Sequence, residues 1–486
     1  MTELQKYNNY IDGKWVKPTS GKYFKNINPA DYDDVIGEFP LSSGVDGKAA
    51  VDSASEAFNT WSKMLPKDRE VYLNRFVDML EDNVQRIGEA ICREEGKTLK
   101  DAISEPEKSI RECSFMIGEG RRLEGITMPS DRNGVESVAK RVPIGVVTAI
   151  SPWNFPFITP LRKIISALVT GNTVVFKPSS DTPHTGVIIM ELFHGAGFPP
   201  GVVNMVIGKG DDLGDSIVSD PLVKGITFTG STDVGKKINR KASNNFTKLQ
   251  FEMGGKNPAI VADYKDIPHA AREITDAAFS LTGQRCTSIS RLVVLREHEE
   301  ELVSSIVENM KDIVVGNGKD PSVYYGPMIN EAAGKKCMEY IESAREENAK
   351  ILVGGNRLTG GEYDKGFYIE PTLIVNADNE MKVSREEIFG PVLVVIAVES
   401  FDEAIEISNR TKYGLSSVLF TDNLDYIGRF SGEVEAGMLH INHGTVTDPF
   451  MPFGGIKDSG LGEYSKGSTN KTFFTNWKVT YTKYTR

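Results

Sequence analysis

Cys286 is the residue of this 486-residue chain best suited to nucleophilic chemistry, and it lies in the stretch Leu281-Thr-Gly-Gln-Arg-Cys-Thr-Ser288. A cysteine needs only a partly formed thiolate and a nearby base to attack a carbon centre. Gly283 and the small polar residues after Cys286 predict a tight turn into a helix, whose N-terminus would lower the pKa of the thiol. A cysteine taken alone is more often a small buried hydrophobic residue, so the rest of the chain has to decide.

Two polar residues elsewhere have the types that would assist such a nucleophile. Asn154 stands in Pro152-Trp-Asn-Phe-Pro156, where the flanking prolines would fix its amide as a donor for a developing oxyanion. The simpler interpretation is that a loop asparagine forms a turn. Glu252 ends an apolar stretch and precedes two glycines, which suits a general base, and an ion pair with Lys256 is the structural alternative.

Helices and strands follow one another in a regular order around these residues. Three amphipathic helices are expected first, at 47–64, 67–88 and 100–120. Apolar strands near 144–150, 173–178, 202–207 and 223–229 then alternate with helices, which is typical of a doubly wound parallel sheet covered on both faces. Ligands bind such sheets at the carboxyl ends of the strands, where Lys177 would lie.

The loop from Phe228 to Lys236 joins a buried strand to a helix and is a candidate nucleotide site. Gly230 would permit a tight turn, and Ser231 with nearby backbone amides would suit a pyrophosphate at the helix N-terminus. The loop matches neither the dinucleotide glycine fingerprint nor a Walker loop, so a plain strand-to-helix turn is an equal alternative.

Composition limits the remaining function classes. The net charge of -11 and the pI near 5.3 argue against general binding to nucleic acid or to an anionic membrane. The four cysteines are widely spaced and the six histidines are scattered, which indicates no disulfide framework and no metal site. The N-terminus lacks a signal-peptide pattern and no run of about 18 apolar residues occurs, so a cytoplasmic enzyme is expected.

Seven stretches in order resemble the aldehyde dehydrogenase superfamily, and the resemblance extends from about Tyr10 to the end of the chain. They are Pro152-Trp-Asn-Phe-Pro156, Val175-Phe-Lys-Pro178, Phe228-Thr-Gly-Ser231, Phe251-Glu-Met-Gly-Gly-Lys256, Gly283-Gln-Arg-Cys286, Glu387-Ile-Phe-Gly-Pro391 and Pro452-Phe-Gly-Gly455. Any one of these matches could be accidental, whereas seven in the family's order are not. The resemblance therefore favours Cys286 as a nucleophile.

The resemblance also implies an α/β architecture in three parts. These are a doubly wound Rossmann-like cofactor domain (1–121 and 144–252), a second α/β catalytic domain (253–450) and a small β oligomerisation arm (122–143 and 468–486). In a dimer, segment 122–143 of one subunit would pair with the C-terminal strand of the other. A homodimer or homotetramer is expected.

In the implied mechanism, Cys286 attacks an aldehyde to give a thiohemiacetal, with the oxyanion held by the Asn154 amide and the Cys286 backbone N–H. Hydride then passes to NAD or NADP, and Glu252 activates the water that hydrolyses the resulting thioester. The expected cofactor-binding residues are Trp153, Lys177, Ser180, Gly230, Ser231, Glu387 and Phe389. Relatives that transfer the acyl group to coenzyme A usually lack this glutamate, so a free acid is the expected product.

Ser180 departs from the pattern of NAD-preferring relatives, which often carry a glutamate three residues after the lysine. That glutamate would bind the adenosine ribose and repel a 2'-phosphate. Removing a like charge at about 4 Å relieves about 1 to 4 kcal/mol, so NADP should be accepted.

Substrate choice is less directly encoded. Arg285 beside the nucleophile, with Arg122 or its neighbours Arg111 and Arg121, would recognise an anion far from the aldehyde, and an ω-carboxylated semialdehyde is the first expectation. The loop that begins at His443 instead resembles loops in relatives that oxidise aromatic aldehydes.

Two hypotheses from other classes remain. A cysteine hydrolase of the nitrilase kind also uses cysteine, glutamate and lysine but would have no use for the nucleotide loop. An inactive structural relative is the other, and it would bind neither cofactor nor aldehyde.

Overall fold

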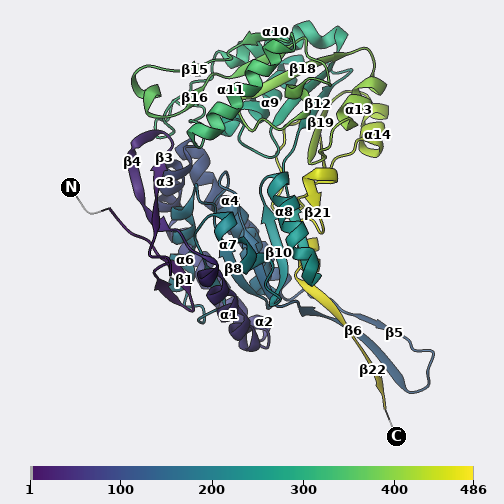
Figure 1. Ribbon diagram of the computed structural model, residues 1–486. Helices are drawn as coiled ribbons and strands as arrows, with labels where there is room; N and C mark the ends of the chain where they lie inside the picture. Colours follow the sequence, from purple (N-terminus) through teal and green to yellow (C-terminus); the bar gives the residue numbers. More distant parts are fainter. Residues whose placement is uncertain (1–3, 485–486) are drawn as a thin grey trace.

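The computed structural model describes residues 4–484 and shows two α/β lobes joined side to side, with a long β arm projecting from one of them (Figure 1). The first lobe is formed mainly by the chain up to Glu252 and is joined again by the segment at Gly460–Leu461, and the second lobe lies between them in the sequence. After the second lobe, the chain returns to the first lobe and ends with its C-terminal strand in the arm.

The first lobe is built on an eight-stranded sheet of order β2-β1-β9-β8-β7-β10-β11-β21. Five neighbouring strands, β9 to β11 in that order, are parallel, and the other pairings are antiparallel. The strands are β1 Asn9–Ile11, β2 Lys14–Val16, β7 Val146–Ile150, β8 Thr173–Lys177, β9 Val203–Met205, β10 Val223–Thr229, β11 Lys248–Glu252 and β21 Gly460–Leu461. The chain winds outward from β7 in one direction and returns to β10 on its other side. The predicted doubly wound order is therefore confirmed, with the order of strands reversing between β7 and β10.

Helices cover both faces of this sheet because the buried strands alternate their side chains between two apolar clusters. Val147, Val174 and Phe176 face one cluster, and Val146 and Val175 face the other. The helices are α1 Gly44–Trp61, α2 Pro66–Asp82, α3 Val84–Glu95, α4 Leu99–Glu119, α5 Ile158–Val169, α6 Pro183–Gly195, α7 Gly210–Val218 and α8 Thr232–Ala242. Helices α1, α7 and α8 pack on one face, and α2 to α6 build the other.

The helix predicted at 67–88 is wrong as a single element. The chain breaks at Asn83, whose backbone is not helical, and two helices, α2 and α3, result. Apolar residues recur at helical spacing on both sides of Asn83, so the sequence pattern alone predicts one continuous helix.

The second lobe contains a seven-stranded sheet of order β14-β17-β18-β13-β12-β19-β20, parallel except for β14. Its strands are β12 Asn257–Val261, β13 Ile289–Leu295, β14 Lys350–Val353, β17 Thr372–Val375, β18 Val392–Val398, β19 Ser416–Phe420 and β20 Met438–Ile441. Its helices are α9 Ile267–Phe279, α10 Arg296–Met310, α11 Glu331–Glu346, α12 Lys382–Arg385, α13 Phe401–Asn409 and α14 Leu424–Glu433. The 3-10 turns of the chain are η1 Ser243–Asn245, η2 Ser280–Gly283, η3 Gly361–Lys365, η4 Lys457–Ser459 and η5 Ser468–Thr472. This α/β architecture agrees with the predicted fold class, while the predicted domain boundaries stay a prediction.

Two small antiparallel pairs complete the strands outside the arm. They are β3 Tyr23–Asn28 with β4 Asp31–Pro40, and β15 Arg357–Leu358 with β16 Tyr368–Ile369.

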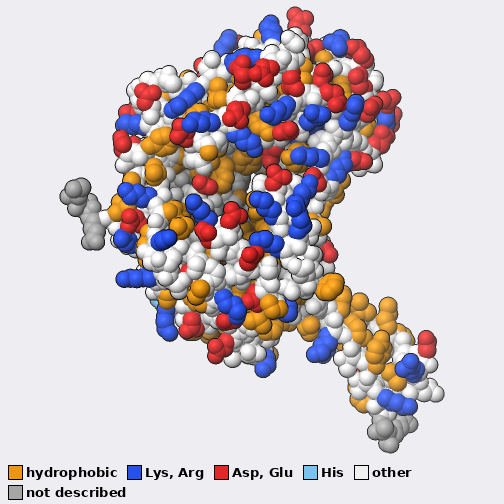
Figure 2. Space-filling view, in the orientation of Figure 1, with side chains coloured by type: hydrophobic (Ala, Val, Ile, Leu, Met, Phe, Trp, Pro, Cys, Tyr) orange, Lys and Arg blue, Asp and Glu red, His pale blue; other side chains and the backbone are white. Residues whose placement is uncertain are grey.

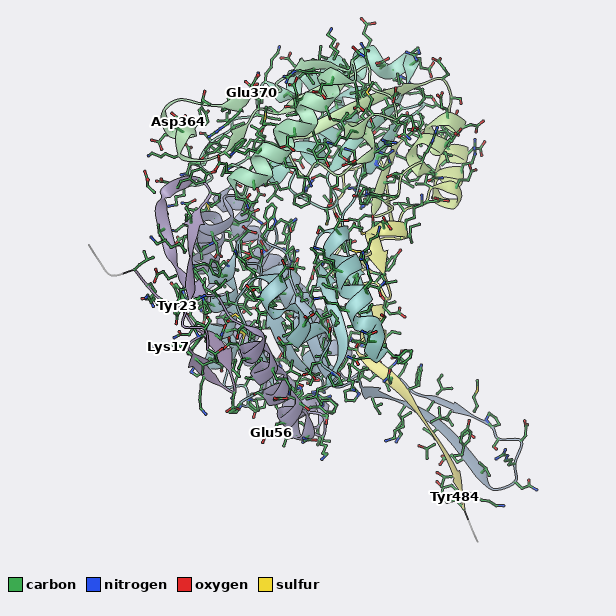
Figure 3. All side chains as sticks on the ribbon, viewed as in Figure 1. Lys17, Tyr23, Glu56, Asp364, Glu370 and Tyr484 are labelled. Atoms are coloured by element: carbon green, nitrogen blue, oxygen red, sulfur yellow. The ribbon has the colours of Figure 1, made fainter. Side chains whose placement is uncertain are left out.

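The arm is a three-stranded antiparallel sheet in which β6 (Val135–Pro143) lies between β5 (Ile126–Met128) and β22 (Thr475–Lys483). Strand β22 pairs with β6 of the same chain over its whole length, from Thr475 opposite Pro143 to Lys483 opposite Val135. The expectation that this pairing crosses a dimer is therefore wrong. At the arm's tip, the Tyr484 hydroxyl donates to Glu136 (2.8 Å), and neighbouring side chains project into solvent (Figure 3).

Candidate active site

The candidate site lies where the two sheets meet. Strand β11 ends at Glu252 and β12 begins at Asn257, so only four residues separate the carboxyl end of one sheet from the amino end of the other. Cys286 stands just before β13, which pairs with β12 in parallel. The chain connectivity therefore brings Cys286 and Glu252 to the same junction.

Cys286 sits in a turn into a strand, and the predicted helix after it is wrong. The chain leaves α9, passes through η2, and enters β13 at Ile289. Leu281 and Thr282 have positive φ angles of 57° and 59°, a conformation that costs non-glycine residues about 1–3 kcal/mol each. Gly283 also has a positive φ of 64°, and a Cβ there would lie 2.2 Å from the Gly390 carbonyl oxygen.

Hydrogen bonds hold this strained turn in place from both sides. Asn257 Nδ2 donates to the carbonyl oxygens of Cys286 (2.8 Å) and Ser288 (2.9 Å). On the other side, Gln284 accepts from the Ile329 backbone N–H (3.0 Å). The position of the thiol is thus fixed before any substrate binds.

The Cys286 thiol is half-buried, and its pKa is raised, whereas the sequence predicted a lowered pKa. Burial raises the pKa of Cys286 to about 12, and the negative charge of Glu252 adds to the effect. No helix N-terminus is present to lower it, because a strand follows. The resting thiol therefore keeps its proton, and the proton must leave as the sulfur attacks.

Asn154 reaches the nucleophile's own turn. Its side-chain Nδ2 donates to the carbonyl oxygen of Gln284 (2.9 Å), two residues before Cys286. Its backbone oxygen accepts from the buried Lys97 ammonium (2.7 Å), which also pairs with Glu105 (3.1 Å). The second N–H of the Asn154 amide is left for another acceptor.

The Glu105 carboxylate fixes the rest of the same loop. Its Oε1 accepts from the backbone N–H groups of Phe157 (2.8 Å) and Ile158 (2.9 Å), where α5 begins. Lys97, between α3 and α4, and Glu105, on α4, could not be located from the sequence, because they lie about 50 residues before the loop that they hold.

Glu252 is buried at the end of β11, with one oxygen engaged and one free of protein partners. Oε2 accepts from the Thr229 hydroxyl (3.1 Å) and lies 3.8 Å from Arg162 Nη1, while Oε1 has no hydrogen-bond partner. The structure pairs Glu252 with Arg162 and not with Lys256, the alternative considered from the sequence. An unsatisfied buried carboxylate oxygen is unusual and suits a group that binds a water molecule.

The predicted cofactor residues lie around the reversal point of the first sheet. Ser231 caps α8 after β10, with its hydroxyl accepting from the Val234 N–H (3.4 Å), and Gly230 stands directly before it. Lys177 ends β8, and its buried ammonium contacts only the Pro178 carbonyl oxygen (3.2 Å). Burial lowers the pKa of Lys177 to about 8.

Glu387, Phe389 and Trp153 lie at the junction itself. Glu387 Oε1 accepts from the Gly255 N–H (2.9 Å), and a Cβ at Gly254 would lie 2.2 Å from the Glu387 carboxylate and would displace it. Phe389 has a positive φ of 59°, and its ring meets Trp153 edge to face at 5.5 Å.

Ser180 lies in the loop after β8, three residues beyond Lys177, and is half-buried. The neighbouring carboxylate of Asp181 accepts from Asn330 Nδ2 (3.2 Å). The Asp181 carboxylate next to Ser180 is thus hydrogen-bonded to a residue of the second lobe.

The predicted substrate residues are not gathered around the thiol. Arg285 turns away from Glu252: its Nη2 donates to the Ala277 carbonyl oxygen (2.9 Å) on α9. Arg122 pairs with Glu119 (3.0 Å) with its side chain 65% exposed, at the base of the arm. His443 is exposed and its ring packs against that of His440 at 5.2 Å.

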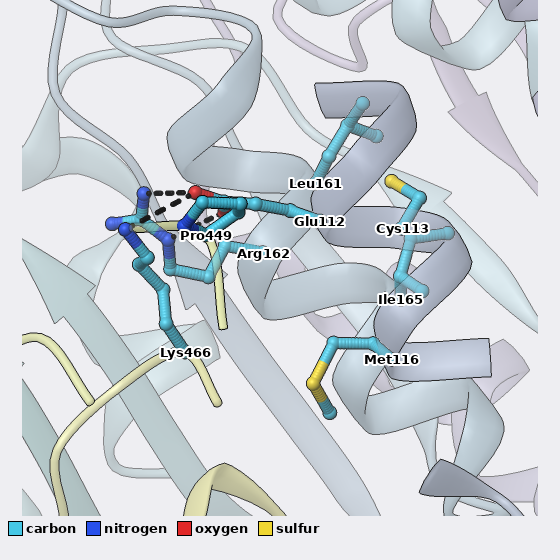
Figure 4. Close-up of a pocket in the computed structure, with 8 residues that line it drawn as sticks. All are labelled: Glu112, Cys113, Met116, Leu161, Arg162, Ile165, Pro449 and Lys466. Atoms are coloured by element: carbon cyan, nitrogen blue, oxygen red, sulfur yellow. Dashed lines mark hydrogen bonds and ion pairs between the residues drawn. The ribbon is translucent and has the colours of Figure 1, made fainter. Parts of the chain in front are cut away.

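A cluster that the sequence analysis did not find lies beside Glu252. Arg162, on α5, donates through Nε (3.0 Å) and Nη2 (3.2 Å) to the two carboxylate oxygens of Glu112 on α4. Lys466, from the tail, lies 3.4 Å from the same carboxylate. Figure 4 shows dashed lines that join the Glu112 carboxylate to both cations, and the pocket that these three residues line is completed by Cys113, Met116, Leu161, Ile165 and Pro449.

One signal in the sequence could have located Arg162. It stands with Lys163 in the mostly apolar α5, where Lys163 is buried and the Arg162 side chain is only 10% exposed. Charged residues on the buried face of a helix are rarely tolerated unless they are paired or functional.

Neither a metal cluster nor a spanning helix occurs between residues 4 and 484. No group of three or more histidine, cysteine, aspartate or glutamate side chains in that range could hold a metal ion. Over the same part of the chain, every helix is too short or too polar to cross a membrane.

Comparison with known proteins agrees with this geometry. The model of the aldehyde dehydrogenase family matches residues 15–480. The alpha-ketoglutaric semialdehyde dehydrogenase of Bacillus subtilis (strain 168) is 40% identical over 484 residues, 99% of each chain, and the malonate-semialdehyde dehydrogenase of the same strain is 35% identical over 486 residues, 100% of this chain and 99% of that one. A solved structure of 3,6-anhydro-L-galactose dehydrogenase in complex with NAP superposes with a TM-score of 0.96 at 33% identity, covering 98% of this chain and 100% of that one.

The chain therefore belongs to the aldehyde dehydrogenase family. It is an oxidoreductase that acts on an aldehyde with NAD or NADP, and the sequence prediction of this class is confirmed.

Proposed function

We propose that the protein oxidises ω-carboxylated semialdehydes to free acids through a covalent intermediate on Cys286. The observation that carries this proposal is the buried Arg162, which lies 3.8 Å from Glu252 and faces the pocket beside it. A guanidinium is the side chain best matched to a carboxylate. The relatives whose names specify semialdehydes support the same substrate class.

Cys286 Sγ attacks the aldehyde carbon, and the thiol proton passes to a water molecule and on to solvent as the C–S bond forms. The charge that develops on the aldehyde oxygen is stabilised by the free N–H of the Asn154 amide and by the Cys286 backbone N–H. When bound, NAD(P)+ supplies the hydride acceptor that converts the adduct into a thioester. A water molecule on the free Oε1 of Glu252 then gives up a proton to that carboxylate and attacks the thioester, releasing the acid and restoring the thiol.

The residues around the sheet's reversal point fit the cofactor. Lys177 is a buried cation whose ammonium contacts a single protein oxygen, which leaves donors for ribose hydroxyls. Ser231 and the N-terminus of α8 suit the pyrophosphate, and Glu387 suits the second ribose. Gly230, Trp153 and Phe389 would complete the binding surface.

The protein is proposed to work as a homodimer or homotetramer through the arm. Hydrophobic side chains gather along the arm in Figure 2, and exposed ones on it include Ile126, Met128, Trp477, Val479, Tyr481 and Tyr484. Large exposed apolar patches mark interaction surfaces. The four cysteines are free thiols, which supports a reducing compartment such as the cytoplasm.

Replacing Glu252 with glutamine should separate the two halves of the reaction. The first turnover should still release one equivalent of reduced cofactor per site, while steady-state turnover falls about a hundred- to ten-thousandfold because the general base is lost. Rapid-mixing absorbance of the reduced cofactor measures both phases. Loss of the first turnover together with the steady state would contradict the assignment of Glu252 to hydrolysis.

The double variant Glu112→Gln/Arg162→Met removes one buried charge of each sign, so the net charge of the cluster with Lys466 and Glu252 is unchanged. For an ω-carboxylated aldehyde, kcat/KM should fall about 10- to 100-fold, as expected for a charged hydrogen bond of about 1.5–3 kcal/mol. An uncharged aldehyde of the same length should be affected little. Arg285→Ala serves as the comparison: a selective loss there, without one in the double variant, would return the anion-binding role to Arg285.

Ser180→Glu tests the prediction that NADP is accepted. The introduced carboxylate should repel the 2'-phosphate by about 1 to 4 kcal/mol. This repulsion should lower kcat/KM for NADP and leave kcat/KM for NAD nearly unchanged. Initial rates with each cofactor measure the effect. A wild-type NADP efficiency already about a thousandfold below that of NAD would show that Ser180 does not admit the 2'-phosphate.

The double variant Val479→Asp/Tyr481→Asp places two charges on one face of β22, because alternate residues of a strand share a face. Its mass in solution, measured by light scattering, should fall to that of a smaller assembly. Thr480→Asp, on the opposite face of the same strand, is the matched control. An unchanged mass in the double variant would place the interface elsewhere.

A further inference from the structure

Lys466 is a second buried cation at the candidate site, and the reaction described so far gives it no role. Its side chain is 3% exposed, and its ammonium contacts the Glu112 carboxylate (3.4 Å) and the Thr447 hydroxyl (3.2 Å). The same ammonium lies 5.5 Å from the ring centre of Phe453, and the Arg162 guanidinium lies 5.2 Å from that ring. Phe453 belongs to the apolar cluster against which Cys286 packs. Both cations therefore face a ring that shares its apolar cluster with Cys286.

The backbone at Lys466 indicates that the side chain is held there against a conformational preference. Lys466 has a positive φ of 64°, a conformation that glycine adopts freely and that a lysine adopts only with strain. The strain is fixed by its neighbour, since Ser465 pairs with Phe453 through two backbone hydrogen bonds (2.6 and 2.9 Å). The tail thus loops over Phe453 and directs the next side chain inward. A strained residue beside a candidate site is reason to look for a function.

The charges of the cluster show what Lys466 adds. Arg162 uses two of its nitrogens on Glu112, so this pair alone presents no net charge to a ligand. Lys466 shares the same carboxylate and brings the three groups to one net positive charge. An ammonium has three N–H donors, and the two protein contacts of Lys466 leave one of them for a ligand. Without Lys466, a carboxylate entering the pocket would meet a neutral pair and the negative charge of Glu252.

We propose that Lys466 is a specificity-determining residue that binds, together with Arg162, the terminal carboxylate of the substrate. This rests on the proposed function, because it assigns a second cation to the same substrate class. The carboxylate would lie in the pocket between the two cations and the apolar wall formed by Met116, Leu161 and Ile165 (Figure 4). The aldehyde at the other end of the molecule would then point past Phe453 toward Cys286.

Two variants of Lys466 test the proposal with a pair of aldehydes of equal length, one ending in a carboxylate and one in a methyl group. Lys466→Met removes the charge and keeps the stem, and Lys466→Gly removes the charge and also the backbone strain. Both should raise KM for the carboxylated aldehyde about tenfold, equivalent to about 1.4 kcal/mol, and leave kcat and the uncharged aldehyde nearly unchanged. Lys466→Gly should unfold at a temperature no lower than that of the wild type.

Lys457→Met is the matched control, since Lys457 belongs to the same tail, has a positive φ of 53° and is exposed. It should change neither aldehyde. Equal losses with both aldehydes in the Lys466 variants, or no loss with either, would overturn the proposal. If the wild-type enzyme shows no preference for the carboxylated aldehyde, the proposed function itself fails, and the two failures are therefore distinguishable.

The pH dependence gives a readout that a purely structural lysine would not affect. Burial lowers the pKa of Lys466 to about 8, so its positive charge is present below that pH and is lost above it. The charged groups that face it are Glu112, Arg162 and Glu252. In the wild type, the KM ratio of carboxylated to uncharged aldehyde should rise as the pH passes about 8, while Lys466→Met should give a flat ratio. The same rise in the variant would assign it to another group and overturn the proposal.

Discussion

A buried guanidinium between two carboxylates is the interaction on which the candidate site depends. Arg162 is bound by Glu112 through two hydrogen bonds and approaches Glu252 at 3.8 Å. A buried charge is tolerated only when it is paired, and removing one partner costs about 3–5 kcal/mol. The ion pair therefore fixes α4 against α5 and places a cation next to the proposed general base. The same requirement brings the tail back to the site, because Lys466 shares Glu112.

The thiol is positioned by backbone geometry more than by its charge. Two strained residues and a glycine form the turn before Cys286, and Asn257 holds the carbonyl oxygens of Cys286 and Ser288. Burial keeps the thiol protonated at rest, with its pKa raised to about 12. A nucleophile that ionises only as it attacks is less exposed to oxidation than a resting thiolate. A water molecule beside the thiol is the proposed acceptor of this proton, which leaves Glu252 free for the hydrolysis step.

Much of the fold could be predicted because its signals are local. Apolar strands alternating with helices predicted the doubly wound sheet, and the end of such a strand placed Lys177 at a ligand-binding edge. The helix after Cys286 was wrong because small polar residues suit a turn into either element. The residues Ile289, Val293 and Val294 that follow favour a strand, and they would have been the better guide.

The residues that we propose bind the substrate were harder to predict because their contacts are not local. Glu112, Arg162 and Lys466 come from α4, α5 and the tail, and no spacing pattern connects them. Arg285 was chosen because it adjoins the nucleophile, but consecutive residues of an extended turn point in different directions, and its guanidinium contacts α9. The pairing of β22 with β6 of the same chain was equally hard to predict, because the two strands lie more than 300 residues apart in the sequence.

The most direct test of the account is the selectivity of the wild-type enzyme. Rates of cofactor reduction should be measured with ω-carboxylated, aliphatic and aromatic aldehydes under the same conditions. The account predicts that an ω-carboxylated aldehyde has the highest kcat/KM, about tenfold or more above an uncharged aldehyde of equal length, as one charged hydrogen bond provides. A preference for benzaldehydes would contradict it and would leave the buried cations with a structural role only.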